Sequence, residues 1–396
     1  MSIYATQRGR RRLRRIGFAS TLTTISALLA VGCGTSDTTQ AGGSDEISDT
    51  EFDLAEVREA AKDEGEINVY NNSSSVEDVA KNYAKKFDVE ATGTKAETSE
   101  MVEKVTREVD ADRVTVSVIQ IEDGGALEGQ LLSQGYVQSW VPSDLESKIE
   151  SENADPLAYV WRALTIAYNP DVYPRGCPID NMWELTDPKW KGHVAFQDPR
   201  LKTNLLNWFI ELTESGAEPL AKAYENYAGE ELDSDEDNAG WEFIARLAKN
   251  DPILTDSDSD AASATGAAGQ KNPPLSILSS AKYNDAEEDG NSLAVCKGLQ
   301  PWIGVSYPKY MAIVKGAPAP NAAKLWVHYV LTEDGIAPEL EDGGYSANTD
   351  VPPASENDPD GLTDFEDQLL RLDPSHNLAY WDGRQGMSDF WQVNAS

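Results

Sequence analysis

The stretch Ile67-Asn68-Val69-Tyr70-Asn71-Asn72-Ser73-Ser74-Ser75 sets the class of fold. Its first four residues include β-branched and aromatic side chains, which predict a strand. The apolar residues after the stretch recur at helical spacing, at Val76, Val79, Tyr83 and Phe87. Ser75 is the expected N-cap of that helix. Because a strand feeds a helix through a polar turn, we expect an α/β fold in which helices are layered on a sheet.

The same alternation of strands and helices continues along the chain. We expect helices at 101–109, at 205–212, within 219–249 and from Pro320. We expect strands at 114–118, 163–168, 194–196 and 311–315. Residues 256–269 are rich in Asp, Ser, Ala and Gly, which predicts a loop. The tail at 352–396 carries Trp381, Phe390 and Trp391, so we expect it to dock on the folded body.

The N-terminus has the composition of an export signal. Six arginines within the first fifteen residues precede an uncharged stretch at 16–32, whose apolar part is shorter than the roughly 20 residues that cross a bilayer. We therefore expect residues 1–32 to be a signal peptide. Ala30-Val31-Gly32-Cys33 resembles the lipobox of bacterial lipoproteins, which implies a lipidated Cys33; the alternative is an ordinary cleaved signal. Residues 33–50 have the composition of a flexible tether.

The chain is strongly acidic, with a formal net charge of -35. Removing the six signal arginines leaves 27 basic residues against 68 acidic ones, a net charge of -41. Such a surface repels polyanions, so nucleic acid is excluded as an expected partner. It also repels anionic lipid, which leaves the lipid tail as the expected membrane attachment. High acidity is also typical of proteins that work in concentrated salt, and the sequence leaves that habitat open.

Two cysteines remain after Cys33, namely Cys177 and Cys296. In an exported protein we expect this pair to form a disulfide. The bond would close a loop of more than 100 residues, which contributes up to ~4 to 5 kcal/mol on the chain-entropy model.

No catalytic or cofactor motif is present in the sequence. It lacks Gly-x-Ser-x-Gly, His-Glu-x-x-His and a phosphate-binding loop, and His193, His328 and His376 are scattered. The run at 256–260 resembles the start of a calcium loop, but Ala261 and Ala267 replace the required Gly and Glu. We therefore expect no metal, no cofactor and no enzyme. With 68 acids, a carboxylate pair for polysaccharide hydrolysis stays open as the alternative, a secreted and lipid-anchored hydrolase.

Several runs resemble family 1 extracellular solute-binding proteins of ABC importers, in the branch that includes ferric-iron-binding proteins. They are Glu64-Gly65-Glu66-Ile67-Asn68-Val69-Tyr70, Ala167-Tyr168-Asn169-Pro170, Trp183-Glu184-Leu185-Thr186-Asp187-Pro188-Lys189-Trp190-Lys191-Gly192-His193-Val194-Ala195-Phe196-Gln197-Asp198-Pro199, and Lys315-Gly316-Ala317-Pro318-Ala319-Pro320-Asn321-Ala322-Ala323-Lys324. The resemblance implies the type II periplasmic-binding-protein fold, two lobes joined by a crossing-strand hinge near 155–165 and 300–310. Lobe 1 would comprise 51–155, lobe 2 would comprise 156–304, and 305–396 would return to lobe 1 and form the C-terminal tail.

The candidate ligand-binding residues follow from this architecture, because ligands of open α/β sheets bind beyond the carboxyl ends of strands and at helix N-termini. Three segments qualify, with the candidates Asn71, Asn72, Ser73 and Ser74; Gln120, Glu122 and Asp123; and Thr203 and Asn204. Four more candidates lie near the crossings: Trp161, Arg162, Tyr168 and Tyr307. The alternative for the three segments is capping and turn chemistry. Arg162 is suited either to clamp an anion or to form an ion pair.

The resemblance implies capture of a small solute by lobe closure and delivery to an ABC permease. The protein would act as a monomer on the outer face of the membrane or in the periplasm. Ferric-binding relatives hold the metal with two adjacent tyrosines, and this chain contains no Tyr-Tyr pair, which argues against iron. Tyr283, Tyr307 and Tyr310 are the nearest substitutes. The ligand stays open among a ferric complex, a phosphonate or other small anion, and a polyamine.

Overall fold

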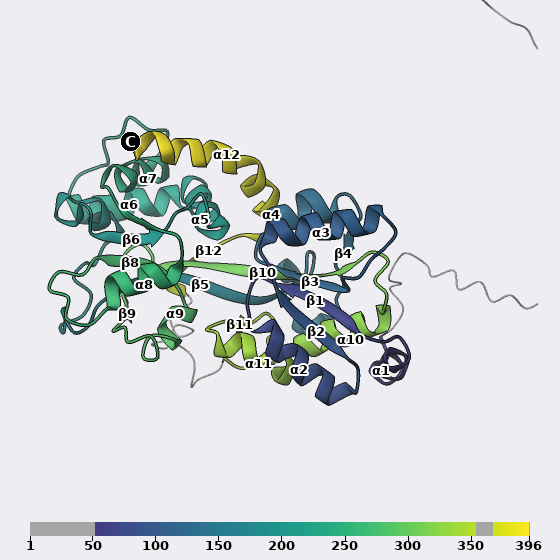
Figure 1. Ribbon diagram of the computed structural model, residues 1–396. Coiled ribbons are helices and arrows are strands. Elements are labelled where there is room, and N and C mark those ends of the chain that lie inside the picture. Colours follow the sequence, from purple (N-terminus) through teal and green to yellow (C-terminus); the bar gives the residue numbers. More distant parts are fainter. Residues whose placement is uncertain (1–51, 354–366, 396) are drawn as a thin grey trace, which may run out of the picture. The chain divides into compact units, whose positions relative to one another are not determined.

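The computed structural model describes residues 52–353 and 367–395, which fall within one compact unit (Figure 1). The predicted signal peptide, Cys33 and the tether lie outside the described residues. In the part of the chain that is described, no helix is long and apolar enough to cross a membrane.

Helices and strands alternate along the described chain. The α-helices are α1 Leu54–Lys62, α2 Val76–Phe87, α3 Thr98–Asp110, α4 Gly124–Ala126, α5 Thr203–Thr213, α6 Ala217–Ala228, α7 Ala239–Lys249, α8 Asp258–Gly266, α9 Ala281–Asn284, α10 Pro320–Val330, α11 Glu333–Glu341 and α12 Asn377–Asn394. The strands are β1 Ile67–Asn71, β2 Ala91–Lys95, β3 Val118–Ile121, β4 Val137–Gln138, β5 Ala158–Tyr168, β6 Val194–Gln197, β7 Ile253–Thr255, β8 Leu275–Ser279, β9 Ala294–Val295, β10 Gly304–Val314, β11 Tyr345–Ser346 and β12 Leu369–Arg371. Short turns of other helix types are η1 Leu127–Leu132, η2 Glu146–Lys148, η3 Ser151–Asn153, η4 Met182–Thr186, η5 Pro188–Trp190 and η7 Pro374–His376.

The strands form one mixed sheet in the order β2-β1-β3-β10-β5-β8-β6-β7. At one end β1 runs parallel to β2 and β3, and at the other β6 runs parallel to β7 and β8. Between these halves, the long strands β5 and β10 pair with each other antiparallel, with Arg162 opposite Tyr307. We call the β1–β3 half with its helices the first lobe and the β6–β8 half with its helices the second lobe. The two parallel halves are thus joined by two crossing strands, near the positions that the sequence predicts.

Each lobe has its own apolar core. In the first lobe, Tyr83 and Phe87 of α2 pack against Trp326 and Tyr329 of α10. In the second lobe, the core includes large aromatic side chains from several helices: Trp183, Phe209, Phe243 and Trp391. Trp391 belongs to α12, so the C-terminal helix contributes to the second core. The residue boundaries given above for the lobes remain a prediction.

Two local predictions are wrong and a third holds only in position, each because of a tertiary or capping contact. The strand expected at 114–118 begins only at Val118, because the backbone N–H of Thr115 is held by Glu108 Oε2 at 2.8 Å. The loop expected at 256–269 contains α8, because the Ser257 side chain caps that helix and its alanines are buried. Ser75 occupies the N-cap position of α2, as predicted, but its side chain does not cap the helix, because its hydroxyl donates to Glu339 Oε1 at 3.0 Å instead.

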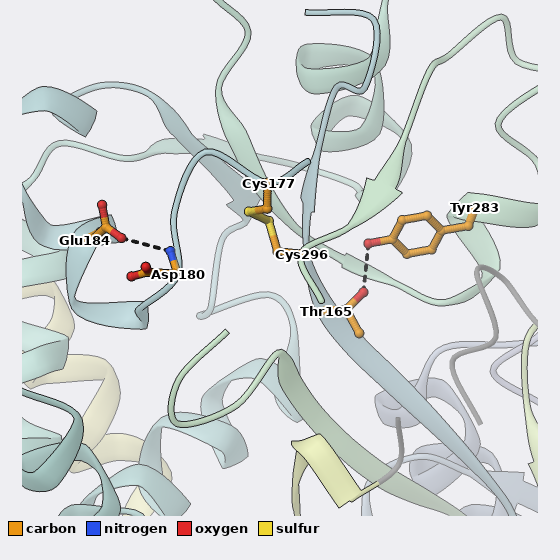
Figure 2. The surroundings of a disulfide bond; sticks show 6 residues. All are labelled: Thr165, Cys177, Asp180, Glu184, Tyr283 and Cys296. Carbon is orange, nitrogen blue, oxygen red and sulfur yellow. Dashed lines mark hydrogen bonds between the residues drawn. A yellow bond between two sulfur atoms is a disulfide. The ribbon is translucent and has the colours of Figure 1, made fainter. Parts of the chain in front are cut away.

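Cys177 and Cys296 form a disulfide in the second lobe (Figure 2). Cys177 follows β5 and Cys296 lies between β9 and β10, so the bond joins segments next to both crossing strands. The backbone N–H of Cys296 also donates to the carbonyl of Ile166 at 2.8 Å. The disulfide and this hydrogen bond together fasten the β9 segment to the end of β5.

Candidate functional site

A polar cavity of about 910 Å³ lies between the two lobes, beside the crossing strands. The first lobe lines it with the turn at 72–74, the N-terminal half of α3 and the segment 122–130. The second lobe lines it with the N-termini of α5, α8 and α9. The crossing strands add Arg162 and Tyr307, and α12 adds Trp381. The cavity is therefore bounded by both lobes and by the strands that connect them.

Nine of the thirteen predicted ligand-binding residues line this cavity: Asn72, Ser73, Ser74, Glu122, Asp123, Arg162, Thr203, Asn204 and Tyr307. The fold thus brings together all three predicted segments and two crossing-strand residues. Their role in binding a ligand remains a prediction.

The other four predicted residues do not line the cavity. Trp161 is next to Arg162 on β5, so it faces the opposite side of the sheet, where its Nε1 donates to Asn153. Tyr168 lies at the far end of β5 and packs against the second core. Asn71 and Gln120 are buried beneath the cavity wall, where Asn71 Nδ2 donates to Gln120 Oε1 at 3.1 Å.

A buried charged network lies directly under the first-lobe wall, and sequence patterns did not reveal it. Arg162 Nη2 donates to Glu339 Oε2 at 2.5 Å and to Asp342 Oδ2 at 2.7 Å. Lys309 Nζ, on the neighbouring strand, donates to Glu339 Oε2 at 3.2 Å and to Asn71 Oδ1 at 2.9 Å. Arg162 is thus held by acids of the protein in a buried ion pair, while its Nε has no hydrogen-bond partner among the described residues.

The pKa values in this network follow from burial opposed by the partner charges. Burial raises the pKa of the Glu339 carboxyl, but Lys309 and Arg162 lower it by more, so Glu339 titrates well below its usual range. Burial lowers the pKa of Lys309, and the charge of Glu339 offsets only part of this effect. Burial also raises the pKa of the Tyr307 hydroxyl, and the charge of Glu122 adds to that shift. Glu339 is therefore a carboxylate at neutral pH, and Tyr307 a neutral hydroxyl.

The network holds the serine turn in place. Ser73 Oγ donates to Asp342 Oδ2 at 2.9 Å, and Ser75 Oγ donates to Glu339 Oε1 at 3.0 Å. Asn71 Oδ1 accepts the backbone N–H of Ser73 at 2.9 Å. Besides Arg162, which was expected either to form an ion pair or to clamp an anion, the sequence offers a signal for Lys309, because a lysine within an otherwise uncharged strand requires a buried partner.

The second predicted segment, around Asp123, is covered by the C-terminal helix α12. Asp123 caps the short helix α4 and also accepts both guanidinium branches of Arg384 from α12. A Cβ on Gly124 would lie 2.3 Å from Asn377 Oδ1, so α12 packs directly on the backbone of α4. The N-terminus of α4 is therefore closed to a ligand by the protein itself.

Arg384 connects the two lobes through α12, because its Nε also donates to Asn207 of α5 at 3.3 Å. We expect Arg384→Gln to lower the free energy of unfolding by about 2–3 kcal/mol, since it leaves the buried Asp123 carboxylate without its cation. Urea-induced unfolding measures this loss. Gln385→Ala, at an exposed neighbouring position on α12, is the matched control. Equal stability of both variants would contradict the bridging role of Arg384.

The third predicted segment is the N-terminus of α5, and no side chain caps it. Lys202 pairs with Asp258 Oδ2, which joins the N-termini of α5 and α8. Asn204 is only 4% exposed, yet neither its Nδ2 nor its Oδ1 has a hydrogen-bond partner among the described residues. The same is true of Asp258 Oδ1. This wall therefore presents polar atoms that the protein does not satisfy.

The three tyrosines considered for iron do not converge. Tyr307 lines the cavity, whereas Tyr310 is bonded to Asn377 at 3.1 Å and the Tyr283 hydroxyl to Thr165 Oγ1 at 2.8 Å (Figure 2). Over the described residues, no group of three or more His, Cys, Asp and Glu side chains is placed to hold a metal ion.

Two parallel half-sheets joined by antiparallel crossing strands, with a polar cavity beside the crossing, define the periplasmic-binding-protein class. Residues 78–363 match the sequence profile of the family described as bacterial extracellular solute-binding protein, and the chain belongs to this family. No curated protein sequence matches the chain significantly.

Solved structures of the same class share the fold at low sequence identity. Apo ferric ion-binding protein A from Pasteurella haemolytica is 15% identical with a TM-score of 0.63, over 83% of this chain and 98% of that chain. Iron-bound HitA from Pseudomonas aeruginosa is 16% identical with a TM-score of 0.60, over 83% and 99%. AfuA from Actinobacillus pleuropneumoniae, with fructose-6-phosphate bound, is 19% identical with a TM-score of 0.60, over 84% and 98%. These likenesses confirm the predicted α/β fold.

Proposed function

We propose that this chain is the substrate-binding component of an ABC importer, which captures a small solute and delivers it to a membrane permease. The observation that carries the proposal is the polar cavity, which is lined by both lobes and by the crossing strands. Rotation about the crossing strands would close the lobes on a solute, and the closed form would be the one that docks on the permease. Membership of the extracellular solute-binding family supports a location outside the cytoplasm for this event.

We further propose that the mature protein is a monomer attached to the outer face of the membrane through a lipid on Cys33. The lipobox-like sequence before Cys33 supports the lipid, and the tether composition of 33–50 would let the body stand off the membrane. The net charge of the mature chain would repel an anionic membrane surface, so a covalent lipid is the more effective attachment.

A hydrolase is the less supported function. Five of the seven acids that line the cavity are already held in ion pairs with basic side chains: Glu103, Asp123, Asp258, Asp285 and Asp342. A glycosidase needs one carboxyl group that can give up a proton and a second carboxylate that stays free to act. A carboxylate that is already held by a basic side chain is not free for either task, so this lining suits binding and positioning rather than catalysis.

Ligands named for the similar structures do not carry over directly. Iron is bound in HitA, but here the tyrosines do not converge. Fructose-6-phosphate is bound in AfuA, but here Arg162 is already paired with Glu339 and Asp342. The ligand therefore has to be deduced from this cavity.

Isothermal titration of the mature chain, after a thermal-shift screen, tests the proposed function. The screen would include metals, polyamines, phosphonates, organic acids and sugars, because a ligand that binds the folded state raises its melting temperature. We expect one saturable heat with a stoichiometry near one and no consumption of the solute. Turnover of a polysaccharide by the same sample would replace the transport function by the hydrolase.

A further inference from the structure

The formal charges on the cavity wall are largely neutralised in pairs. Arg162 pairs with Asp342 at 2.7 Å and Lys282 pairs with Asp285 at 2.6 Å. Lys202 pairs with Asp258, and Arg384 of α12 pairs with Asp123. A strongly charged ligand would have to break one of these pairs or stay without a counter-ion in a closed cleft, and both cost free energy.

The remaining charged side chains of the wall lie on the first-lobe side. Glu103 pairs with Arg107 at 2.9 Å, and Glu97 forms the capping box of α3 with Glu100. Lys95 is exposed. Glu122 is half-buried, and it is the acid that adds most to the raised pKa of Tyr307. Considered alone, Glu122 would suit a cationic ligand. The choice between ligand classes therefore depends on the hydrogen-bond donors and acceptors of the second-lobe wall.

The second-lobe wall requires a ligand that both donates and accepts hydrogen bonds. Asn204 Nδ2 is a donor without a protein partner, whereas Asn204 Oδ1 and Asp258 Oδ1 are acceptors without one. Buried polar atoms of this kind are satisfied in native proteins, so a bound molecule is expected to supply the partners. The ion pair between Lys202 and Asp258 joins the N-termini of α5 and α8, so Asn204 and Asp258 lie on one wall of the cavity.

Among an ammonium group, an anionic carboxylate or phosphate, and a hydroxyl group, the hydroxyl meets both requirements with a single group. An ammonium group only donates, and would leave Asn204 Nδ2 without an acceptor. A carboxylate or a fully ionised phosphate group only accepts, and would leave two acceptors without donors. Either anion would also be repelled by the charge of Asp258. A hydroxyl group donates and accepts, so neighbouring hydroxyls can satisfy Asn204 and Asp258 together. The ring of Trp381, which is 36% exposed and lines the cavity, adds an apolar face for C–H groups.

We infer that the cleft takes a neutral, hydroxyl-rich solute, a small sugar or polyol, with Asn204 and Asp258 as its specificity-determining contacts. This inference rests on the proposed binding function and names the substrate class of the same site. A cavity of about 910 Å³ is large enough for a solute of this size.

Calorimetric titration of the mature chain with charge-matched probes tests the inference. The probes are a panel of neutral monosaccharides, disaccharides and polyols, together with the phosphorylated and amino forms of each sugar that binds. Spermidine, inorganic phosphate, methylphosphonate and ferric citrate complete the set. We expect a neutral member of the panel to bind at least tenfold more tightly than its charged forms. Tighter binding of a charged probe would overturn the substrate class and leave the binding function intact, whereas no saturable binding of any probe would overturn both.

Asn204→Ala gives a second test that does not depend on a comparison between solutes. Since Asn204 has no partner in the ligand-free protein, we expect the melting temperature of the ligand-free variant to stay close to that of the wild type. Affinity for the neutral solute is expected to fall at least tenfold, because two hydrogen bonds to the ligand are lost.

Asn226→Ala, at an exposed asparagine of the second lobe outside the cavity, is the matched control and should bind as the wild type does. Asn204→Asp keeps the size of the side chain but replaces the donor with a charged acceptor on the same wall as Asp258, so it should also lose affinity. Wild-type affinity in both Asn204 variants would overturn the assignment.

Discussion

Glu339→Gln is expected to lower the free energy of unfolding by about 3–5 kcal/mol, because it leaves the buried Lys309 without a carboxylate and leaves Arg162 with Asp342 alone. Glu339 is 0% exposed and accepts hydrogen bonds from Arg162 and Lys309. The same carboxylate accepts hydrogen bonds from Asn71 Nδ2 at 2.9 Å and from the Tyr159 hydroxyl at 3.1 Å. The amide of glutamine keeps the shape but supplies no negative charge, and its NH₂ group would face donors.

Urea-induced unfolding of the Glu339→Gln variant at pH 7 measures this cost. Glu341→Gln is the matched control, because Glu341 is an exposed glutamate at the end of the same helix and should unfold as the wild type does. If Glu339→Gln costs no more than Glu341→Gln, the network contributes nothing to stability and the prediction is wrong.

The pH dependence of the same variant gives an independent check with a definite sign. The folded-state pKa of Glu339 is lowered by Lys309 and Arg162 against the opposing effect of burial. Its contribution to stability is therefore fully present above the unfolded value of about 4.3 and is lost as pH falls toward the lower folded value. We expect the difference between wild type and Glu339→Gln to shrink as the solution is acidified below about pH 4.

Loss of this network should also weaken ligand binding. Ser75, Asn71 and Asp342 connect Glu339 and Arg162 to the serine turn on the cavity wall. The network is part of the first lobe and includes both crossing strands, through Arg162 and Lys309. The stability of the binding surface and the stability of the hinge thus depend on the same buried charges.

Local sequence patterns predict the elements that position the site. The strand Ile67–Asn71, its polar turn and helix α2 follow from β-branched residues and from apolar spacing, which act over a few residues. The wall residues Asn72, Ser73, Thr203 and Asn204 were found because strand ends and helix N-termini carry ligands in α/β folds. Strands, turns and helix N-termini depend on residues that are neighbours in the sequence, so they can be predicted from it.

Contacts between distant residues could not be predicted in this way. Asn71 and Glu339 are 268 positions apart, and Asp123 and Arg384 are 261 positions apart, so no spacing rule connects them. Arg162 is an example. From its position in the sequence it could clamp an anion or form an ion pair, and only the fold places Glu339 beside it. In a chain with 68 acids, the identity of the acid that pairs with each buried cation is decided by packing.

Removing the disulfide with the double variant Cys177→Ala/Cys296→Ala is expected to lower the free energy of unfolding by about 4 kcal/mol. The bond joins residues 119 positions apart, so it removes a large loop-closure entropy from the unfolded chain. Because most of this effect lies in the unfolded state, the cavity should keep its geometry, and affinity for a ligand at 25 °C should change less than about twofold.

Urea-induced unfolding with and without dithiothreitol separates the bond from the loss of the side chains. The reductant should shift the wild type toward the double variant and should leave the double variant unchanged. The bond fastens the β9 segment to the end of β5, and so to the crossing strand that carries Arg162. A large loss of affinity in the double variant would therefore mean that the disulfide also sets the geometry of the crossing, and the purely entropic account would be wrong.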